Sequence, residues 1–263
     1  IRGRKVRDIR QNGSPYIYSA NPALICLEEL RDTNFGAGIP NENLDFYSFA
    51  EWANNCETES FEIHGRFAQG AKIADIINQC EIHSDADVVD ANGVITAKVN
   101  TQVVGGTSIQ ITDNNIIDGL VRTEPATSEI FTVARVSYTT EEGIEALTIR
   151  QFDETTIAEY GYRPIDIDFV MCKSKAQAEK LGARALVQQT LPQITGTMTK
   201  EGYELGVGDV CQTSFTYGDI LPAGSRLKIT GVDKERVTSN KPIKFVARLY
   251  DDEVFTQQLN SII

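Results

Sequence analysis

The chain has 263 residues, of which 41% are hydrophobic and 24% are charged, as in an ordinary globular protein with enough apolar material to bury a core. Lys and Arg number 25 against 37 Asp and Glu, which gives a formal net charge of −12. Because affinity for phosphate comes from basic residues that displace counterions, this balance argues against nucleic-acid binding and against an anionic membrane surface.

The termini and the cysteines indicate where the chain folds. No apolar run approaches the roughly 20 residues that span a bilayer, and no secretion signal opens the sequence. The first residue is Ile1 rather than Met, and we therefore expect a piece of a longer polypeptide. The cysteines are odd in number and never spaced as CxxC, which predicts reduced, mostly buried thiols in a protein folded in a cytoplasm. They are Cys26, Cys56, Cys80, Cys172 and Cys211.

The chain begins with a basic segment and two predicted helices. Residues 1–10 can form one edge strand, and QNGSP at 11–15 is a turn cluster. Asn21 as N-cap and Pro22 at the first helical position start a helix. Asp45 can cap a second helix, in which buried positions recur at i, i+3, i+4 and i+7. The residues of these two apolar faces are Leu24, Leu27 and Leu30, then Phe46, Phe49, Ala50 and Ala53.

A strand, a third helix and a hairpin follow. We expect the strand near Phe61–Phe67 and the helix over a stripe of Ile73, Ile76, Ile77 and Cys80. Asn92-Gly93 lies between two β-prone runs, and both residues tolerate positive φ, so the pair predicts a type I′ hairpin turn. Gly105-Gly106 is then a plausible hinge between two halves of the chain.

The second half is predicted to be mostly β. Two runs that flank Glu141-Glu142-Gly143 form another hairpin, and PIDIDFVM at 164–171 alternates as a strand with one wet face. Ser174 and Gln177 have the spacing of a capping box, which starts a helix that runs to about Leu191 and stops at Pro192. Further strands are expected near Ile194–Thr199, Val210–Phe215, Leu227–Val232 and Ile243–Tyr250.

These elements predict an α+β protein with about four helices and ten or more short strands. The expected arrangement is two mostly β, barrel-like domains with an N-terminal helical part and a few packed helices. We place an α+β domain at 1–104, a β-rich domain with one long helix at 105–250, and a C-terminal extension at 251–263.

No residue pattern indicates catalysis, a cofactor or a metal. The two histidines, His64 and His83, lack HExxH or HxH spacing, and no Ser lies in GxSxG. The glycine stretches GAG at 36–38 and GVG at 206–208 lack both GxGxxG and a P-loop lysine, so they are interpreted as turns. We therefore predict no catalytic, cofactor-binding or metal-binding residues and a protein that is not an enzyme.

Two alternatives remain open. Paired carboxylates could serve a muralytic glycosidase, which would need two carboxyl groups roughly 5–10 Å apart in one concave pocket. A module that binds a host glycan would show clustered exposed aromatics, whereas Trp52 flanks the second helical stripe and is expected in the core or an interface. The candidate carboxylates are Asp85, Asp87 and Asp90, the pair Asp166 and Asp168, and Asp251, Asp252 and Glu253.

Several motifs in a fixed order resemble the tail tip attachment, or host-specificity, protein of lambda-like siphophages. They hold from about Arg2 to Val232, although residues 10–20 look shortened relative to that family. The matching stretches are RGRKV, Asn21-Pro22-Ala23, Arg31 to Gly38, DFYSFAEWANNCE ending at Cys56, IADIINQC, ITDNNIIDG with EIFTVARVSYT, KSKAQAEKLGARAL and LGVGDVCQT.

The resemblance implies a structural hub related to the baseplate hub of contractile phages. It implies a virion protein at the tail tip, assembled in the bacterial cytoplasm as a homotrimer with other tail tip proteins, the tail tube and the tape-measure protein. DNA would pass through the hub without being bound, and this fragment would not bind a membrane. A net charge of −12 is consistent with an acidic channel that repels phosphate.

Overall fold

The structure is a computed structural model that describes most of the chain. It covers residues 4–11, 15–65, 67, 71–91, 93–100, 109–152, 154–199, 202, 205–214, 216–217, 221–233, 242–250 and 260–262. Asn92 of the predicted hairpin turn, the Gly105-Gly106 hinge and the acidic run Asp251, Asp252 and Glu253 lie outside the described residues. Among the described residues, no helix combines the length and the apolar character needed to cross a bilayer.

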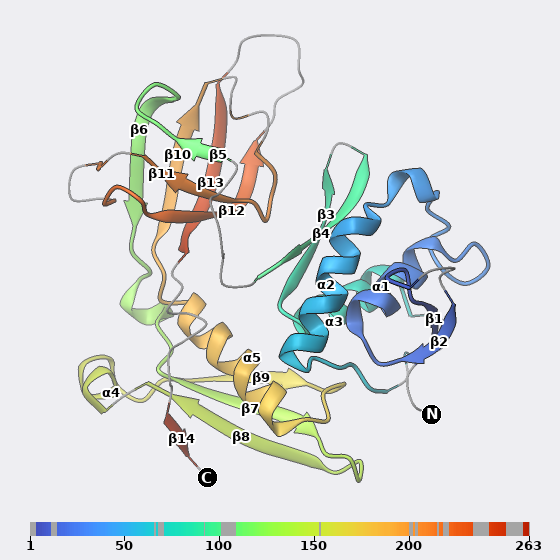
Figure 1. Cartoon of the computed structure of the whole chain (residues 1–263). Coiled ribbons are helices and arrows are strands. Elements are labelled where there is room, and N and C mark those ends of the chain that lie inside the picture. The colour runs from blue at the N-terminus through green and yellow to red at the C-terminus, as the bar shows by residue number, and fades with distance from the viewer. Residues whose placement is uncertain are drawn as a thin grey trace.

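The N-terminal unit consists of helices flanked by two small hairpins (Figure 1). The side-chain oxygen of Asn21 accepts hydrogen bonds from the backbone N–H groups of Ala23 and Leu24, and Asp45 does the same for Tyr47 and Ser48, so both predicted N-caps are confirmed. The elements are β1 (Arg4–Arg7), β2 (Tyr16–Ser19), α1 (Pro22–Arg31), η1 (Asn41–Asn43), α2 (Phe46–Glu59), α3 (Ile73–Ile82), β3 (Ala86–Ala91) and β4 (Val94–Val99).

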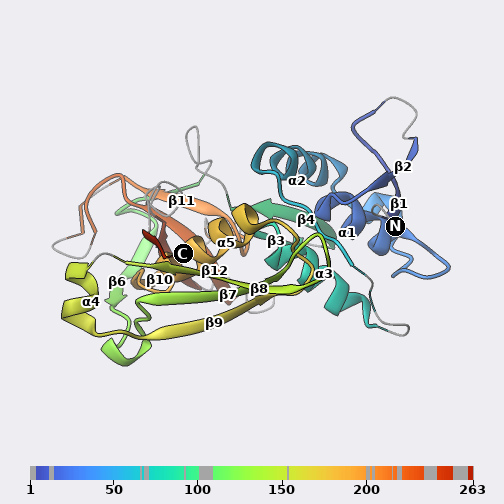
Figure 2. The ribbon, with the colours of Figure 1, turned by 90° about the horizontal axis from the view of Figure 1, so that it is seen from below.

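A four-stranded sheet in the order β14-β8-β7-β9 forms the second unit, with α5 packed on one face (Figures 1 and 2). Asp166 and Asp168 on β9 are exposed while Phe169 is buried, which confirms the predicted strand with one wet face. The elements are η2 (Thr127–Glu129), β7 (Val133–Thr139), β8 (Glu145–Gln151), α4 (Glu154–Tyr160), β9 (Pro164–Phe169), α5 (Lys175–Gln188) and β14 (Asn260–Ile262).

A curled six-stranded sheet in the order β5-β11-β12-β13-β10-β6 forms the third unit (Figure 1). Its strands precede and follow the segment from β7 to α5 in the sequence, so that β6 pairs with β10 and β5 pairs with β11. The strands are β5 (Ile109–Ile111), β6 (Ile116–Thr123), β10 (Gln193–Met198), β11 (Val210–Thr213), β12 (Arg226–Asp233) and β13 (Ile243–Tyr250). The predicted α+β class is confirmed.

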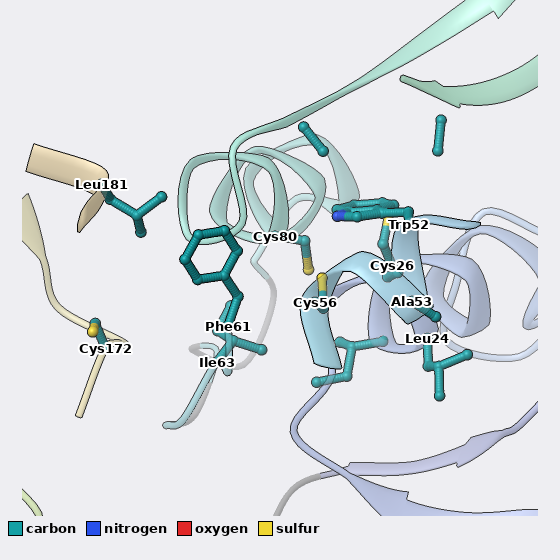
Figure 3. Packing of buried hydrophobic residues seen from close by; sticks show 14 of the residues in the cluster. Leu24, Cys26, Trp52, Ala53, Cys56, Phe61, Ile63, Cys80, Cys172 and Leu181 are labelled. Carbon is teal, nitrogen blue, oxygen red and sulfur yellow. The ribbon is translucent and has the colours of Figure 1, made fainter. Parts of the chain in front are cut away.

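Buried apolar side chains form two separate clusters. One joins the N-terminal helices to α5 and the four-stranded sheet, and the other fills the six-stranded sheet. Trp52 is fully buried in the first cluster, beside Cys26, Cys56 and Cys80 (Figure 3), which confirms its expected place in the core. The domain boundaries at residues 104 and 250 stay a prediction.

Three local expectations were wrong. The segment expected as a strand near Phe61–Phe67 contains no strand residue where it is described, because single hydrogen bonds to Ala20 and Met171 replace a ladder. The short helix α4 was missed because none of its residues is buried and no apolar stripe marks it. Ser174 does cap α5, but the side chain of Gln177 bonds distant backbone groups instead of closing a capping box.

Candidate functional site

His83 is a structural residue that joins α3 to the turn after β9. Its side chain is fully buried, and its Nδ1 lies 2.8 Å from the carbonyl oxygen of Gln79. Its Nε2 accepts a hydrogen bond of 3.3 Å from the backbone N–H of Met171. The two contacts fit the neutral Nδ1–H tautomer, and burial lowers the pKa of His83 below its usual value of 6.5.

Gln177 extends this polar junction. Its amide nitrogen donates to the carbonyl oxygens of Glu62, at 3.0 Å, and of His83, at 2.8 Å, while its amide oxygen accepts from the backbone N–H of Glu62. One side chain of α5 therefore satisfies backbone groups in two segments more than 90 residues earlier. Such a network fixes the helical unit against α5.

The carboxylates predicted as candidates divide among three places. Asp90 accepts a hydrogen bond from the backbone N–H of Gly93 at the hairpin turn. Asp166 forms an exposed, bidentate ion pair with Arg135. Asp85, Asp87 and Asp168 line one pocket of about 410 Å³, between α3, β9, α5 and β12. The structure thus brings together only part of the predicted set.

Glu81 is a fourth carboxylate in this pocket, and no motif in the sequence marks it. Burial raises the pKa of both Glu81 and Asp85, although Glu81 accepts a 2.6 Å hydrogen bond from the backbone N–H of Val88. For Asp85, burial outweighs the opposite effects of Arg184 at 3.3 Å and of the Asn100 amide at 2.9 Å.

Basic side chains pair with Asp85 and with the neighbouring Glu59. Arg184 is 6% exposed and bridges Asp85 and Glu59, and Lys180 also pairs with Glu59 at 2.9 Å. Burial opposes ionisation of Glu59, but these two bases lower the pKa of its carboxyl overall. The arrangement resembles a buried structural ion-pair network, in which every charge is compensated.

Two further ion pairs connect the six-stranded sheet to the β3–β4 hairpin. Lys228 on β12 lies 2.6 Å from a carboxylate oxygen of Asp87 and also contacts Asn100. Lys98 on β4 lies 3.0 Å from Asp209. These contacts join units whose hydrophobic clusters are separate.

A second, larger pocket of about 710 Å³ lies beside the β1–β2 hairpin. It collects basic and aromatic side chains, and His64 is half-buried in it, with Nε2 2.9 Å from a Glu62 carboxylate oxygen. Sequence reasoning missed this site, although the alternating bases of RGRKV and the two tyrosines of YIYS at 16–19 are a usable signal.

The glycine motifs serve the backbone, as predicted. A side chain on Gly36 would lie 2.1 Å from the carbonyl oxygen of Glu29, and Gly38 and Gly208 have positive φ angles of 66° and 85°. They belong to the turn after α1 and the turn before β11.

All five cysteines are buried, which confirms that part of the prediction. The thiols of Cys26 and Cys80 form a hydrogen bond with each other, and burial raises the pKa of Cys56 to about 12. Within the described part of the chain, no group of three or more His, Cys, Asp or Glu side chains is arranged to hold a metal ion.

Comparison with known proteins gives a fold but no close relative. No family model matches the sequence, and none of the curated proteins is similar to it. A chain in the virion of a native gene transfer agent particle aligns with a TM-score of 0.56 at 16% identity, over 79% of this chain and 48% of that chain. This chain shares the fold of the aligned part of that virion protein.

Two other solved structures are weaker matches. The tail protein from Neisseria meningitidis MC58 has a TM-score of 0.48 at 12% identity, over 73% of this chain and 58% of that chain. Prophage tail protein gp18 from Listeria monocytogenes EGD-e has a TM-score of 0.43 at 15% identity, over 66% of this chain and 51% of that chain. TM-scores below 0.5 do not establish a shared fold. The chain spans about half the length of these solved chains.

Proposed function

We propose that this chain is a structural component of the tail of a phage, a prophage or a related particle. The observation that carries the proposal is the fold shared with a protein of the gene transfer agent virion over 79% of this chain. The ordered motifs from RGRKV to LGVGDVCQT, which resemble a siphophage tail tip protein, support the same role. We place the chain at the tail tip, as part of the hub that closes the tail tube.

The hub would be a homotrimer in which each subunit contacts the next through an unlike face. Its neighbours would be other tail tip proteins, the tail tube and the tape-measure protein. The proposed division into 1–104, 105–250 and 251–263 would give each subunit two β-containing domains for this ring. The net charge of −12 supports passage of DNA without binding, since few phosphate contacts could form along an acidic channel.

Localisation in assembled particles tests this role. We expect an antibody against this chain to label the distal end of tails in electron micrographs, and cross-linked particles to give a band at three times the subunit mass. Labelling on the capsid, or no labelling of particles that contain the intact tail, would refute the proposal. The cross-linked particles, and not the oligomeric state of the isolated chain, decide whether the assembled hub is a trimer.

A muralytic activity is the second candidate, because one pocket gathers Glu81, Asp85, Asp87 and Asp168. The raised pKa of Glu81 suits a general acid, whereas Asp85 and Asp87 are paired with Arg184 and Lys228. We favour the non-enzymatic role because Arg184 and Lys228 pair with Asp85 and Asp87, the two acids that could act as base or nucleophile beside Glu81. Release of reducing sugars from peptidoglycan by the wild type, abolished in Glu81→Gln, would establish the enzyme instead.

A further inference from the structure

The pocket beside the β1–β2 hairpin is built from segments far apart in the sequence. The backbone N–H of Ile63 donates to the carbonyl oxygen of Ala20 at 2.9 Å, which ties the segment after α2 to the end of β2. The backbone N–H of His64 donates to the carbonyl oxygen of Met171 at 2.7 Å, which ties the same segment to the turn after β9. The pocket walls are therefore held by the folded backbone.

The lining has an apolar base and aromatic sides. Ile25 and Ile63 are each 4% exposed and present the apolar base together with Met171. Tyr18 is 70% exposed, and the Phe67 ring is half-buried, so both rings offer surface to a ligand. A volume of about 710 Å³ lies within the range of small-molecule sites.

The polar lining is basic. Arg4, Lys5, His64 and Lys173 line the pocket, and none of its described lining residues is Asp or Glu. Arg4 is paired with Glu29, while Lys5 and Lys173 are exposed. This is unusual in a chain of net charge −12, and two of these bases, Arg4 and Lys5, come from the first ten residues, which hold five bases and one acid.

The outer face of the hairpin continues the same chemistry. In the antiparallel register Lys5 lies opposite Tyr18 and Arg7 opposite Tyr16, so all four side chains share one face. Arg7 stacks over the Tyr16 ring at 4.8 Å and donates from Nε to its hydroxyl at 2.6 Å. Tyr16 is thereby held in place, and the Lys5–Tyr18 pair borders the pocket.

We propose that this pocket binds an anionic saccharide, in which a sugar ring carries a carboxylate or a phosphate. The ring would lie against Tyr18 and Phe67, because aromatic faces pack on the apolar C–H face of a sugar. The anionic group would meet Lys5 and Lys173, whose ammonium groups form charge-assisted hydrogen bonds to carboxylate or phosphate oxygens.

The lining also favours an anionic saccharide over a neutral sugar and over an acidic peptide. A neutral sugar would form no charge-assisted hydrogen bond with Lys5 and Lys173, whereas a carboxylate or phosphate group would do so. An acidic peptide could use the same cations, but a concave pocket with an apolar base suits a compact ring better than an extended strand. This inference is independent of the proposed tail function.

Calorimetric titration of the whole chain with three oligosaccharides tests the proposal. The probes are tetragalacturonate for a carboxylate source, an oligomer of glycerol phosphate that carries glucose for a phosphate source, and neutral maltotetraose. We expect saturable binding of at least one anionic probe, weakened by added salt, and no binding of maltotetraose. Whichever anionic probe binds more tightly identifies the source.

Variants locate the site. We expect Lys5→Glu and Lys173→Glu each to weaken binding at least tenfold, and Tyr18→Ala to weaken it similarly without changing the salt dependence. Lys244→Glu, at an exposed lysine on β13, is the matched charge control and should bind as the wild type does. Circular dichroism checks that each variant is folded.

Several results would overturn the proposal. One is binding of maltotetraose as tight as that of the anionic saccharides, and another is no binding of either anionic saccharide. A third is a loss of affinity in Lys244→Glu as large as that in Lys5→Glu. Tighter binding of a tetraglutamate peptide than of both anionic saccharides would show that the pocket serves an acidic peptide instead.

Discussion

At the scale of single residues, His83 connects acidity to stability. Its Nε2 accepts a hydrogen bond from a backbone N–H, so protonation would place a second donor against that group. Burial also lowers the pKa of His83 in the folded state, whereas the unfolded chain titrates near the ordinary value of 6.5. The folded protein therefore takes up this proton less readily than the unfolded chain does.

We predict that His83 makes the protein less stable as the pH falls from 7.5 to 5.5. The unfolded state binds the proton near pH 6.5 and the folded state binds it less readily, so the free energy of unfolding decreases by up to about 1.4 kcal/mol per pH unit below 6.5. Urea unfolding of the wild type and His83→Gln at both pH values measures this loss.

The comparison between these two proteins isolates the histidine. Glu81 and Asp85 have raised pKa values in the folded state, so their carboxyls act in the opposite direction and favour the folded protein at low pH. They are present in both proteins and cancel in the difference. An equal pH slope in His83→Gln and the wild type would contradict the prediction.

Local signals predicted some residue roles and could not predict others. The N-caps Asn21 and Asp45 act on backbone groups two or three residues away, so spacing in the sequence is sufficient to find them. Gln177 had the spacing of a capping box, but its partners Glu62 and His83 are more than 90 residues distant. The basic pocket was missed for the same reason, since its walls meet only in the fold.

At the scale of elements, α5 lies close to β7 because a glycine permits it. A Cβ atom on Gly182 would lie 2.4 Å from Cγ2 of Val136, whose side chain is fully buried. This glycine lowers the helix propensity of α5, and the contact with the sheet compensates for it.

We predict that Gly182→Ala destabilises the protein by about 1–2 kcal/mol, because overpacking against Val136 outweighs the gain of up to about 1 kcal/mol in helix propensity. Thermal or urea unfolding measures the change. Val136→Ala in the same chain should relieve the contact, so the double variant should be more stable than the two single effects predict. A more stable Gly182→Ala single variant would show that α5 is not tightly packed there.

Elements with a strong period were the ones that the sequence predicted well. The predicted strand at Ile243–Tyr250 has the bounds of β13, and its buried and exposed residues alternate over most of its length. The segment from Phe61 alternates too, with Phe61 and Ile63 buried, yet its backbone bonds two different neighbours instead of one strand. Alternation of apolar and polar residues indicates which side chains are buried. Whether the backbone forms a β-ladder depends on a partner strand, which the local sequence pattern does not contain.

At the scale of the whole molecule, charged contacts join two hydrophobic clusters. The pairs Lys228–Asp87 and Lys98–Asp209 connect the six-stranded sheet to the β3–β4 hairpin, and Arg248 bonds the carbonyl oxygen of Gln188 at the end of α5. These side chains are only partly buried, so each pair contributes at most about 1 kcal/mol.

We predict that Lys98→Ala with Lys228→Ala uncouples the six-stranded sheet from the rest of the molecule. In calorimetry, the single unfolding transition of the wild type should become broader or divide in two in the double variant, because the two clusters then unfold less cooperatively. Lys244→Ala, on the same sheet, serves as the control and should keep the wild-type transition. An unchanged transition in the double variant would assign the coupling to other contacts.

The nested strand order also governs the order in which the chain can fold during synthesis. The six-stranded sheet pairs Ile109 with Cys211 and Leu120 with Gly196, across the segment that contains β7, β8, β9 and α5. On the ribosome, β5 and β6 emerge long before their partners, while β7, β8 and β9 can pair within 40 residues. The edges of β5 and β6 therefore stay unpaired until the later strands have been synthesised. A chaperone that protects nascent strands would act on this protein while residues 109 to 193 are being synthesised.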